Sequence, residues 1–131
     1  MKKINTACII DDDDIAIWGI KKLMEYANFC ENILVFKNGL EALNKLKPMI
    51  ENGVDVPEII LLDLNMPIMD GWGFLEEFIQ IKTEKQIKIY IVSSSIDPED
   101  YKKAKSYSEV SNFLVKPLKT EHLKGILEEI N

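Results

Sequence analysis

The chain has 131 residues, and its 16 Lys plus Arg stand against 22 Asp plus Glu, which gives a net charge of −6 at pH 7. This length fits one domain, so we expect residues 1–131 to form a single unit without an output domain. The negative charge, together with the lack of a run of basic residues, argues against a surface that follows a phosphate backbone. We therefore expect no binding to nucleic acid.

The apolar segments are too short for targeting or for insertion into a membrane. The run 7–10 is shorter than the core of a signal peptide, and no stretch approaches the roughly 20 apolar residues of a membrane span. Cys8 lies in a predicted strand and Cys30 in a predicted connection, without the spacing of metal ligands. We expect a reduced, cytoplasmic protein that does not associate with a membrane.

Short apolar runs alternate with segments of helical periodicity along the whole chain. Four branched apolar residues in a row at 59–62 are typical of a strand that is buried on both faces of a parallel sheet. An alternation of this kind predicts an α/β fold with helices on both sides of the sheet. The five predicted strands are 6–10, 33–36, 59–62, 87–92 and 110–115.

Capping residues indicate where the helices begin. Asp13 or Asp14 can cap the first helix, and Asp70 precedes a helix that begins at residue 71. Asp97 stands before a proline at the first helical position, which predicts a helix from 98 to about 107. The apolar face of that helix is thin, so it is a candidate for movement. We expect Pro48 to end or kink the second helix.

Polar side chains directly follow four of the predicted strands. The carboxyl ends of parallel strands meet at one edge of a sheet, so these side chains converge if the four strands are neighbours. Each has an ordinary explanation when taken alone, as a helix cap, a turn residue or a solvated charge, but together they indicate a functional site. They are Asp11 and Asp12 after the first strand, Asp63 after the third, Ser93 after the fourth and Lys116 after the fifth.

Three converging carboxylates repel one another unless a cation joins them, and Mg²⁺ prefers oxygen ligands. A metal next to a carboxylate, a hydroxyl and an ammonium group suits a phosphoryl group. We take Asp63 as the phosphoacceptor, with Ser93 and Lys116 binding the phosphoryl oxygens. The predicted Mg²⁺ ligands are Asp11, Asp12, Asp63 and the backbone carbonyl of Asn65.

These motifs resemble the receiver domain of two-component response regulators, the CheY-like family, in its single-domain form. The resemblance extends from Ala7 to the end of the chain, and its motifs occur in the family's order and spacing. They are the acid pair 11–12, the phosphoacceptor segment 62–71 with the sequence LDLNMPIMDG, the switch hydroxyl at Ser93 and the Lys116-Pro117 pair. The resemblance implies a flavodoxin-like (βα)5 fold with a doubly wound, parallel five-stranded sheet of order 2-1-3-4-5. It also implies a cis peptide bond before Pro117.

Two positions depart from the common family pattern. Ser93 stands where threonine is more frequent, and it keeps the hydroxyl. Phe113 stands where many members have tyrosine, so we expect an aromatic switch that makes no hydrogen bond through a ring hydroxyl.

The resemblance implies a stand-alone receiver that accepts a phosphoryl group on Asp63 from a sensor histidine kinase or a histidine phosphotransfer protein. Self-dephosphorylation aside, we do not expect a dedicated enzyme. The signal is expected to leave by protein contact through the face of the fourth helix, fifth strand and fifth helix, from a monomer or a phosphorylation-dependent dimer. Trp18 and Trp72 either mark surfaces for partners or are partly buried.

Three other readings of the motifs are less consistent with the residues. A phosphatase with an Asp nucleophile usually needs a second acid two residues later, where this chain has Asn65. A nucleotide-binding or flavin-binding module needs a glycine-rich loop, and the acids at 11–14 would repel phosphates there. A receiver that has lost phosphorylation and serves only as an adaptor would lack one of the required residues, and none is missing.

Overall fold

The computed structural model describes residues 4–130, which form five parallel strands and five helices in strict alternation. The strands form one sheet in the order β2-β1-β3-β4-β5, which confirms the predicted flavodoxin-like topology. The strands are β1 (Ile4–Ile10), β2 (Cys30–Phe36), β3 (Ile59–Leu62), β4 (Lys88–Ser93) and β5 (Val110–Val115). The helices are α1 (Asp14–Tyr26), α2 (Gly39–Asn52), α3 (Gly71–Phe78), α4 (Pro98–Ser106) and α5 (Thr120–Ile130).

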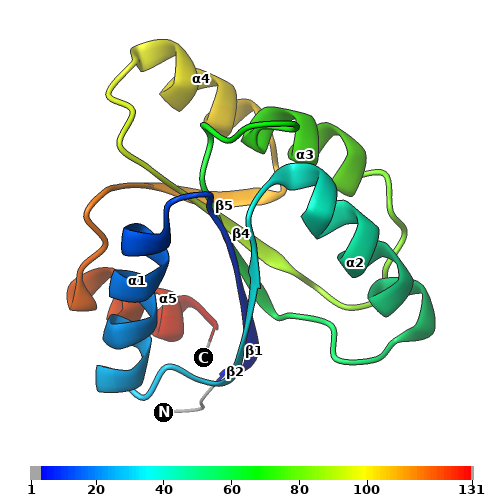
Figure 1. Cartoon of the computed structure of the whole chain (residues 1–131), viewed down its shortest axis with the longest axis horizontal. Coiled ribbons are helices and arrows are strands. Elements are labelled where there is room, and N and C mark those ends of the chain that lie inside the picture. The colour runs from blue at the N-terminus through cyan, green and yellow to red at the C-terminus, as the bar shows by residue number, and fades with distance from the viewer. Residues whose placement is uncertain (1–3, 131) are drawn as a thin grey trace.

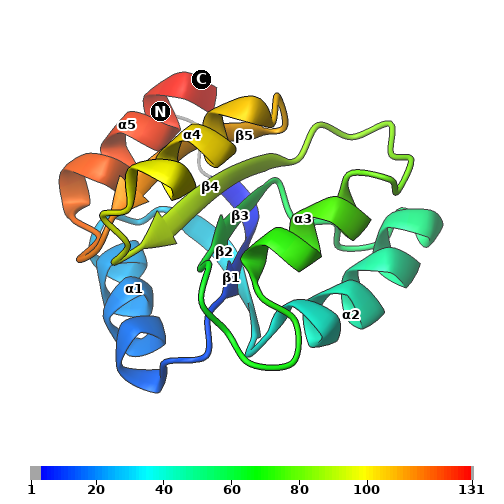
Figure 2. The ribbon, with the colours of Figure 1, turned by 90° about the horizontal axis from the view of Figure 1, so that it is seen from above.

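Helices cover both faces of the sheet, with α1 and α5 on one face and α2, α3 and α4 on the other (Figure 1). Figure 2 shows the same arrangement from above, with α1 and α5 on one side of the strands and α2 and α3 on the other. All four residues of β3 are buried, because their side chains alternate between the two hydrophobic cores. β3 therefore reads as a continuous apolar run, and the polar Asp63 follows directly where this strand ends.

The predicted helix starts carry side-chain caps. Asp13, rather than Asp14, caps α1, and its Oδ1 accepts the Ile15 N–H at 3.0 Å. Asp70 caps α3 by accepting the Gly73 N–H at 2.8 Å, and Asp97 caps α4. Since each cap satisfies a backbone donor that has no partner within the helix, these acids fix where the helices begin after the loops of the sheet edge.

The structure corrects two boundaries. The prediction that Pro48 ends the second helix is wrong, because α2 continues through Pro48 to Asn52, and a kink there stays a prediction. Pro48 and Asn44, whose carbonyl loses its usual donor, are both exposed, so water can replace the missing hydrogen bond. Cys30 was expected in a connection, but it begins β2. β2 is an edge strand, and edge strands tolerate polar residues. Its polar residues 31 and 32 interrupt the apolar pattern, so the pattern did not indicate where the strand begins.

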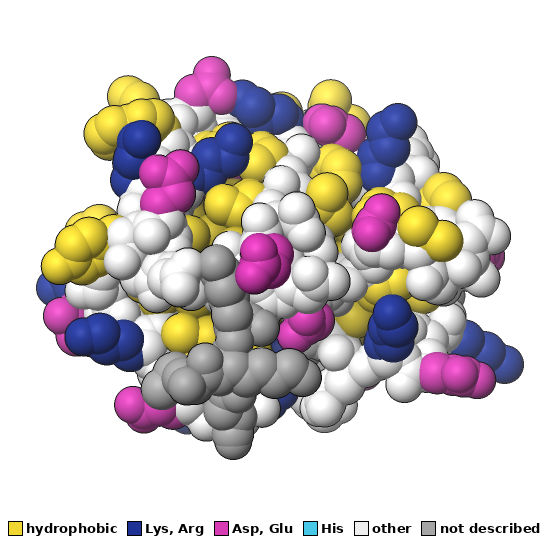
Figure 3. Space-filling model, turned by 90° about the horizontal axis from the view of Figure 1, so that it is seen from below, with side chains coloured by type: hydrophobic (Ala, Val, Ile, Leu, Met, Phe, Trp, Pro, Cys, Tyr) yellow, Lys and Arg dark blue, Asp and Glu magenta, His cyan; other side chains and the backbone are white. Residues whose placement is uncertain are grey.

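One face of the molecule carries side chains of mixed character. On the face seen from below in Figure 3, positively and negatively charged side chains are interspersed, and hydrophobic side chains lie between them. Within residues 4–130, no helix combines the length and the apolar character that crossing a membrane requires.

Gly71, at the start of α3, packs directly against the chain that carries the end of β3. A Cβ atom added at Gly71 would lie 2.5 Å from the Asp63 carbonyl oxygen and 2.9 Å from the Leu64 Cα. Both of these atoms belong to the backbone, so they cannot turn aside as a flexible side chain does. The absence of a side chain at Gly71 therefore fixes how closely α3 approaches the segment that follows β3.

Because of this close approach, Gly71→Ala should lower the free energy of unfolding by about 1–3 kcal/mol. Gly125→Ala is the matched control, since a Cβ atom there meets nothing within 4 Å and α5 gains helix propensity. It should raise stability by about 0.5–1 kcal/mol. Urea unfolding of both variants measures the difference, and equal stability of the two would contradict the close packing at Gly71.

Candidate functional site

The sheet brings the polar residues that follow its strands to one edge. The Asp63 N–H donates to the carbonyl of Ile10 at 2.9 Å, which sets the end of β3 beside the end of β1. The Lys116 N–H donates to the carbonyl of Ser93 at 2.9 Å, which joins the ends of β5 and β4 in the same way. Four strand ends that are distant in sequence thereby share one site.

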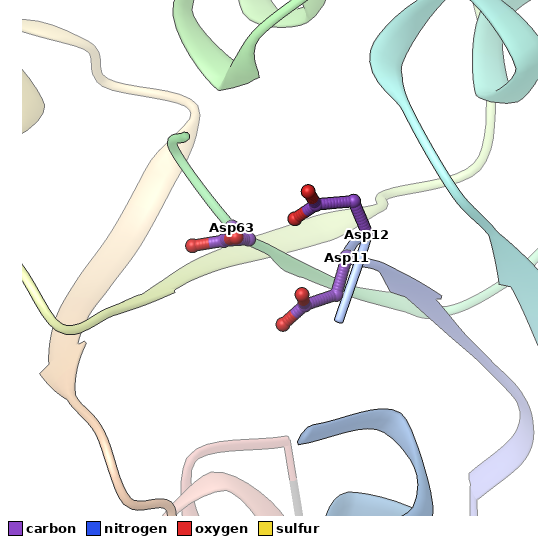
Figure 4. A group of neighbouring side chains, drawn as sticks. All are labelled: Asp11, Asp12 and Asp63. Carbon is purple, nitrogen blue, oxygen red and sulfur yellow. The ribbon is translucent and has the colours of Figure 1, made fainter. Parts of the chain in front are cut away.

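Three carboxylates form the centre of this site (Figure 4). Asp11 and Asp12 follow β1 and Asp63 follows β3, and one oxygen from each lies within 4.8 Å of the others. Asp11 is 2% exposed and Asp63 is 7% exposed, whereas Asp12 lies at the surface. Two of the three acids are thus withdrawn from water, and the third opens the cluster to solvent.

Lys116 is the cation that the structure places against these acids. Its Nζ donates to Asp11 Oδ2 at 2.8 Å and lies 3.7 Å from Asp63 Oδ1. Burial lowers the pKa of Lys116, but the hydrogen bond and the attraction from Asp11, with a further attraction from Asp63, outweigh it and raise the pKa overall. The ammonium group is therefore held in its charged form.

Asp63 has an unfavourable environment for a carboxylate. Burial and then the repulsion from Asp11 raise the pKa of Asp63 from 3.8 to about 6, although Lys116 and the Leu64 N–H oppose this rise. That N–H donates to Asp63 Oδ1 at 2.9 Å. One ammonium group therefore only partly balances the negative charge around Asp63.

The donor set suits a small, hard dication. Carboxylate oxygens are the ligands that Mg²⁺ prefers in proteins, and Mg²⁺ usually keeps several waters, which the exposed side at Asp12 can admit. A divalent ion at the cluster would also offset the repulsion that raises the pKa of Asp63. Asp11, Asp12 and Asp63 thus fit the predicted metal site.

Ser93 and Phe113 lie on the neighbouring strands β4 and β5. Ser93 is fully buried at the end of β4, and its Oγ accepts the Ser95 N–H at 3.1 Å. Phe113 is half-buried in β5 and packs edge-on against Tyr101 of α4, with 5.8 Å between the ring centroids. The Ser93 hydroxyl thus has a hydrogen-bond partner in the turn after β4, and Phe113 lies against α4.

The two remaining predicted residues lie in the connecting loops. Asn65 is exposed, two residues beyond Asp63, and the role of its backbone carbonyl as a metal ligand stays a prediction. The Lys116–Pro117 peptide bond is cis, as the resemblance implies.

Sequence reasoning missed a set of contacts behind Ser93. Ser95 donates its hydroxyl to Asp100, and the Trp72 indole N–H also donates to Asp100. In the sequence, Asp100 is only one of two acids in the first turn of a helix, where acids are common for reasons of the helix dipole. No local pattern reveals that its partners come from α3 and from the turn after β4.

Similar proteins are known from both sequence and structure. A family model for the response regulator receiver domain matches residues 7–128. The probable methanogenesis regulatory protein FilR2 of Methanothrix harundinacea is 29% identical over 122 residues, which cover 93% of this chain and 78% of that protein. The chain spans less than half the length of several other curated relatives that it matches.

Solved structures share the architecture over almost the whole chain. The two-component response regulator from Cytophaga hutchinsonii gives a TM-score of 0.89 at 30% identity, with 98% of each chain covered. The phosphorylated cyanobacterial phytochrome response regulator RcpA gives a TM-score of 0.77 at 25% identity, with 96% of this chain and 90% of that chain covered. Since the family model matches nearly all of the chain and the acids, serine and lysine meet at one sheet edge, this protein belongs to the response regulator receiver domain family of two-component systems.

Proposed function

We propose that this chain is a stand-alone receiver in which Asp63 accepts a phosphoryl group from a phosphohistidine of a sensor histidine kinase or a phosphotransfer protein. Receiver domains in general are phosphorylated on an aspartate, bind Mg²⁺ at an acidic pocket and interact with such proteins. The observation that carries the proposal is the position of Asp63, which shares its site with two acids and the Lys116 ammonium group. A relative of the same fold, RcpA, has been solved in a phosphorylated form.

In the proposed transfer, a carboxylate oxygen of Asp63 attacks the phosphorus of the donor. The new P–O bond forms as the P–N bond of the phosphohistidine breaks, and the imidazole nitrogen keeps the electron pair. Lys116 is near enough to Asp63 to turn to a phosphoryl oxygen, and Ser93 can do so by rotating its hydroxyl away from Ser95. Mg²⁺, held by Asp11, Asp12, Asp63 and the Asn65 carbonyl, would supply positive charge to the transferring group.

The surface next to the acids supports docking of a phosphodonor protein. Ile15 and Trp18 on α1 are 80% and 63% exposed, so the alternative of partial burial for Trp18 is the weaker one. An apolar groove runs beside them, between α1 and the segment after β5, with Pro117 and Leu118 in its wall. A partner that covers this groove would bring its phosphohistidine next to Lys116, which also lines it.

The proposed output surface is the face of α4, β5 and α5. Ile96, Tyr101 and Val115 are exposed there and surround a small apolar pocket that Phe113 also lines. Rotation of Phe113 after Ser93 moves would change this pocket, and a protein partner would read the change. We propose signalling by protein contact from a cytoplasmic monomer or phosphorylation-dependent dimer, without dedicated enzymatic turnover.

The first prediction from the proposed function concerns the phosphoacceptor. Asp63→Asn should abolish labelling by a phosphorylated histidine kinase or by a small phosphodonor, because no carboxylate remains at the attacking position. Asp55→Asn, which removes an exposed acid at a positive φ that asparagine tolerates, should label like the wild type. Base-labile phosphate that persists on the Asp63→Asn protein would refute the assignment.

The second prediction uses the electrostatic conflict at Asp63 in metal-free protein. The folded-state pKa of about 6 lies above the ordinary value of 3.8, so the folded state binds this proton more tightly than the unfolded chain does. Asp63 therefore lowers the free energy of unfolding as the pH rises from about 4 to about 6. In EDTA at pH 7.5, Asp63→Asn should be more stable than the wild type by about 1–3 kcal/mol, since one pKa unit corresponds to about 1.4 kcal/mol.

Mg²⁺ should reverse this order by stabilising the wild type and leaving Asp63→Asn almost unchanged, because binding to the folded state alone raises its stability. Asp12→Asn should show an intermediate response. Urea unfolding with and without Mg²⁺ measures all three proteins. Equal Mg²⁺ effects on the wild type and on both variants would contradict the predicted ligand set.

The third prediction concerns coupling within the domain. Ser93→Ala should still accept phosphate on Asp63, but the NMR signals of Phe113 and α4 should no longer change on phosphorylation, because the hydroxyl that senses the phosphoryl group is gone. Ser106→Ala, which removes an exposed hydroxyl at the end of α4, serves as the control. A wild-type spectral response from Ser93→Ala would exclude Ser93 as the switch.

A further inference from the structure

A chain of hydrogen bonds leads from Ser93 to α4. The Ser95 N–H donates to Ser93 Oγ at 3.1 Å, and the Ser95 hydroxyl donates to Asp100 Oδ2 at 2.6 Å. The other oxygen of Asp100, Oδ1, accepts the Trp72 indole N–H at 3.4 Å. We call Ser95, Asp100 and Trp72 the Asp100 latch. It joins the turn after β4 to α4 and to α3 through one carboxylate.

Trp72 touches both ends of α4. In addition to its bond to Asp100 in the first turn, its ring stacks on Tyr107, the residue that caps the end of α4, with centroids 6.0 Å apart and planes 17° apart. Lys103 lies above the same ring, with its Nζ 4.8 Å from the centroid. Among the residues of α4 only Ala104 is buried, so these side-chain contacts are a large part of what attaches the helix.

Trp72 is also fixed relative to the phosphoacceptor. It follows Gly71, whose N–H donates to the Leu64 carbonyl at 2.9 Å and whose missing side chain lets α3 lie against the Asp63 backbone. Asp100 therefore receives one donor from the Ser93 side of the site and one from the Asp63 side. The contacts through Ser95 and the contacts through Trp72 both connect the sheet edge to α4 at Asp100.

We propose that Asp100 is a positioning residue that holds the resting arrangement of the receiver. Its carboxylate accepts a hydrogen bond from the Ser95 hydroxyl and so holds Ser95 in place. Ser95 then continues to donate its N–H to the Ser93 hydroxyl, which stays directed at the turn after β4. This inference rests on the proposed function, because it assigns a restraint to the switch hydroxyl of the same site.

The restraint acts on the equilibrium between two arrangements. If Ser93 turns to a phosphoryl oxygen, the Ser95 N–H loses its acceptor and the turn that carries the Ser95 hydroxyl shifts with it. The hydrogen bond from the Ser95 hydroxyl to Asp100 is then made in the resting arrangement and lost in the phosphoryl-bound arrangement. Coupling of this kind is reciprocal, so a weaker latch makes the phosphoryl-bound arrangement easier to reach.

The test measures affinity for beryllium fluoride with Mg²⁺, a phosphoryl analogue, by calorimetry on the full chain. Ser95→Ala removes a hydroxyl that donates to Asp100 and also accepts the Asp97 N–H at 3.2 Å. Asp100→Asn keeps the bond from Asp97 and leaves one carbonyl oxygen where two oxygens accepted. Both variants should bind the analogue about 3- to 10-fold more tightly than the wild type, as the loss of one hydrogen bond of typical net strength predicts. Glu99→Gln is the matched control, since it removes a neighbouring exposed charge from the same first turn of α4 and should leave the affinity unchanged.

Tighter binding of the analogue is the result that a merely structural role would not give, and a second measurement tests whether the latch restrains α4 in the resting arrangement. Amide hydrogen exchange in the segment 93–107, without analogue, should be faster in Ser95→Ala and Asp100→Asn than in Glu99→Gln. Trp72→Phe keeps an aromatic ring beside Tyr107 and removes the indole N–H, so it should shift affinity in the same direction by a smaller factor. The double variant Ser95→Ala with Asp100→Asn should gain less than the product of the two single effects, because both variants break one chain of bonds.

The outcomes distinguish the latch from the function on which it rests. A wild-type protein that fails to bind the analogue, or binds it equally after Asp63→Asn, overturns the proposed phosphoacceptor. A wild type that binds through Asp63, while Ser95→Ala and Asp100→Asn bind no more tightly than Glu99→Gln, overturns the latch alone. Weaker binding in both latch variants also overturns it, because the bonds would then favour the phosphoryl-bound arrangement.

Discussion

Repulsion between buried carboxylates at one edge of the sheet is the constraint that the rest of the structure must offset. Asp11 and Asp63 are nearly excluded from water and lie beside the exposed Asp12, and Lys116 is the cationic side chain that contacts them within residues 4–130. Burial of unbalanced carboxylates opposes folding, and the hydrophobic effect along the central strands must exceed that cost. The cluster therefore keeps an unfavourable balance of charge, which a bound cation would offset.

The topology explains why these charges meet. Because β2 lies outside β1, the chain must cross over to place β3 directly beside β1, and the two acid-bearing strand ends become neighbours. β4 and β5 follow on the other side and bring Ser93 and Lys116 to the same edge. Both faces of the central strands are buried, so a shift in register would be opposed by two hydrophobic cores at once. The precision of the polar site is therefore set by apolar packing beneath it.

The sequence was sufficient for the features that depend on local patterns. Continuous apolar runs marked the strands, the acids, the serine and the lysine marked their ends, and Asp70 and Asp97 marked two helix starts, since in each case neighbouring residues determine the structure. The helix through Pro48 was not predictable from propensity, because buried residues on either side, Leu46 and Ile50, hold the helix against the sheet. The Asp100 latch was not predictable either. Ser95 and Trp72 lie five and 28 residues from Asp100 in the chain, and the three side chains meet only in the folded structure.

The helices differ in the kind of interaction that attaches them, and this difference bears on how a signal can move. α1 and α3 insert several apolar side chains into the cores, and such contacts are numerous, non-directional and costly to exchange. α4 buries only Ala104 and is otherwise held by two hydrogen bonds to Asp100, by rings against Trp72 and Phe113, and by a cation above a ring. Directional contacts of this type are few, each of about 0.5–2 kcal/mol, so their sum is comparable to the coupling free energy of a typical switch. A helix attached in this way can change position when one polar partner near Ser93 changes, whereas the hydrophobic cores that hold the sheet edge remain intact.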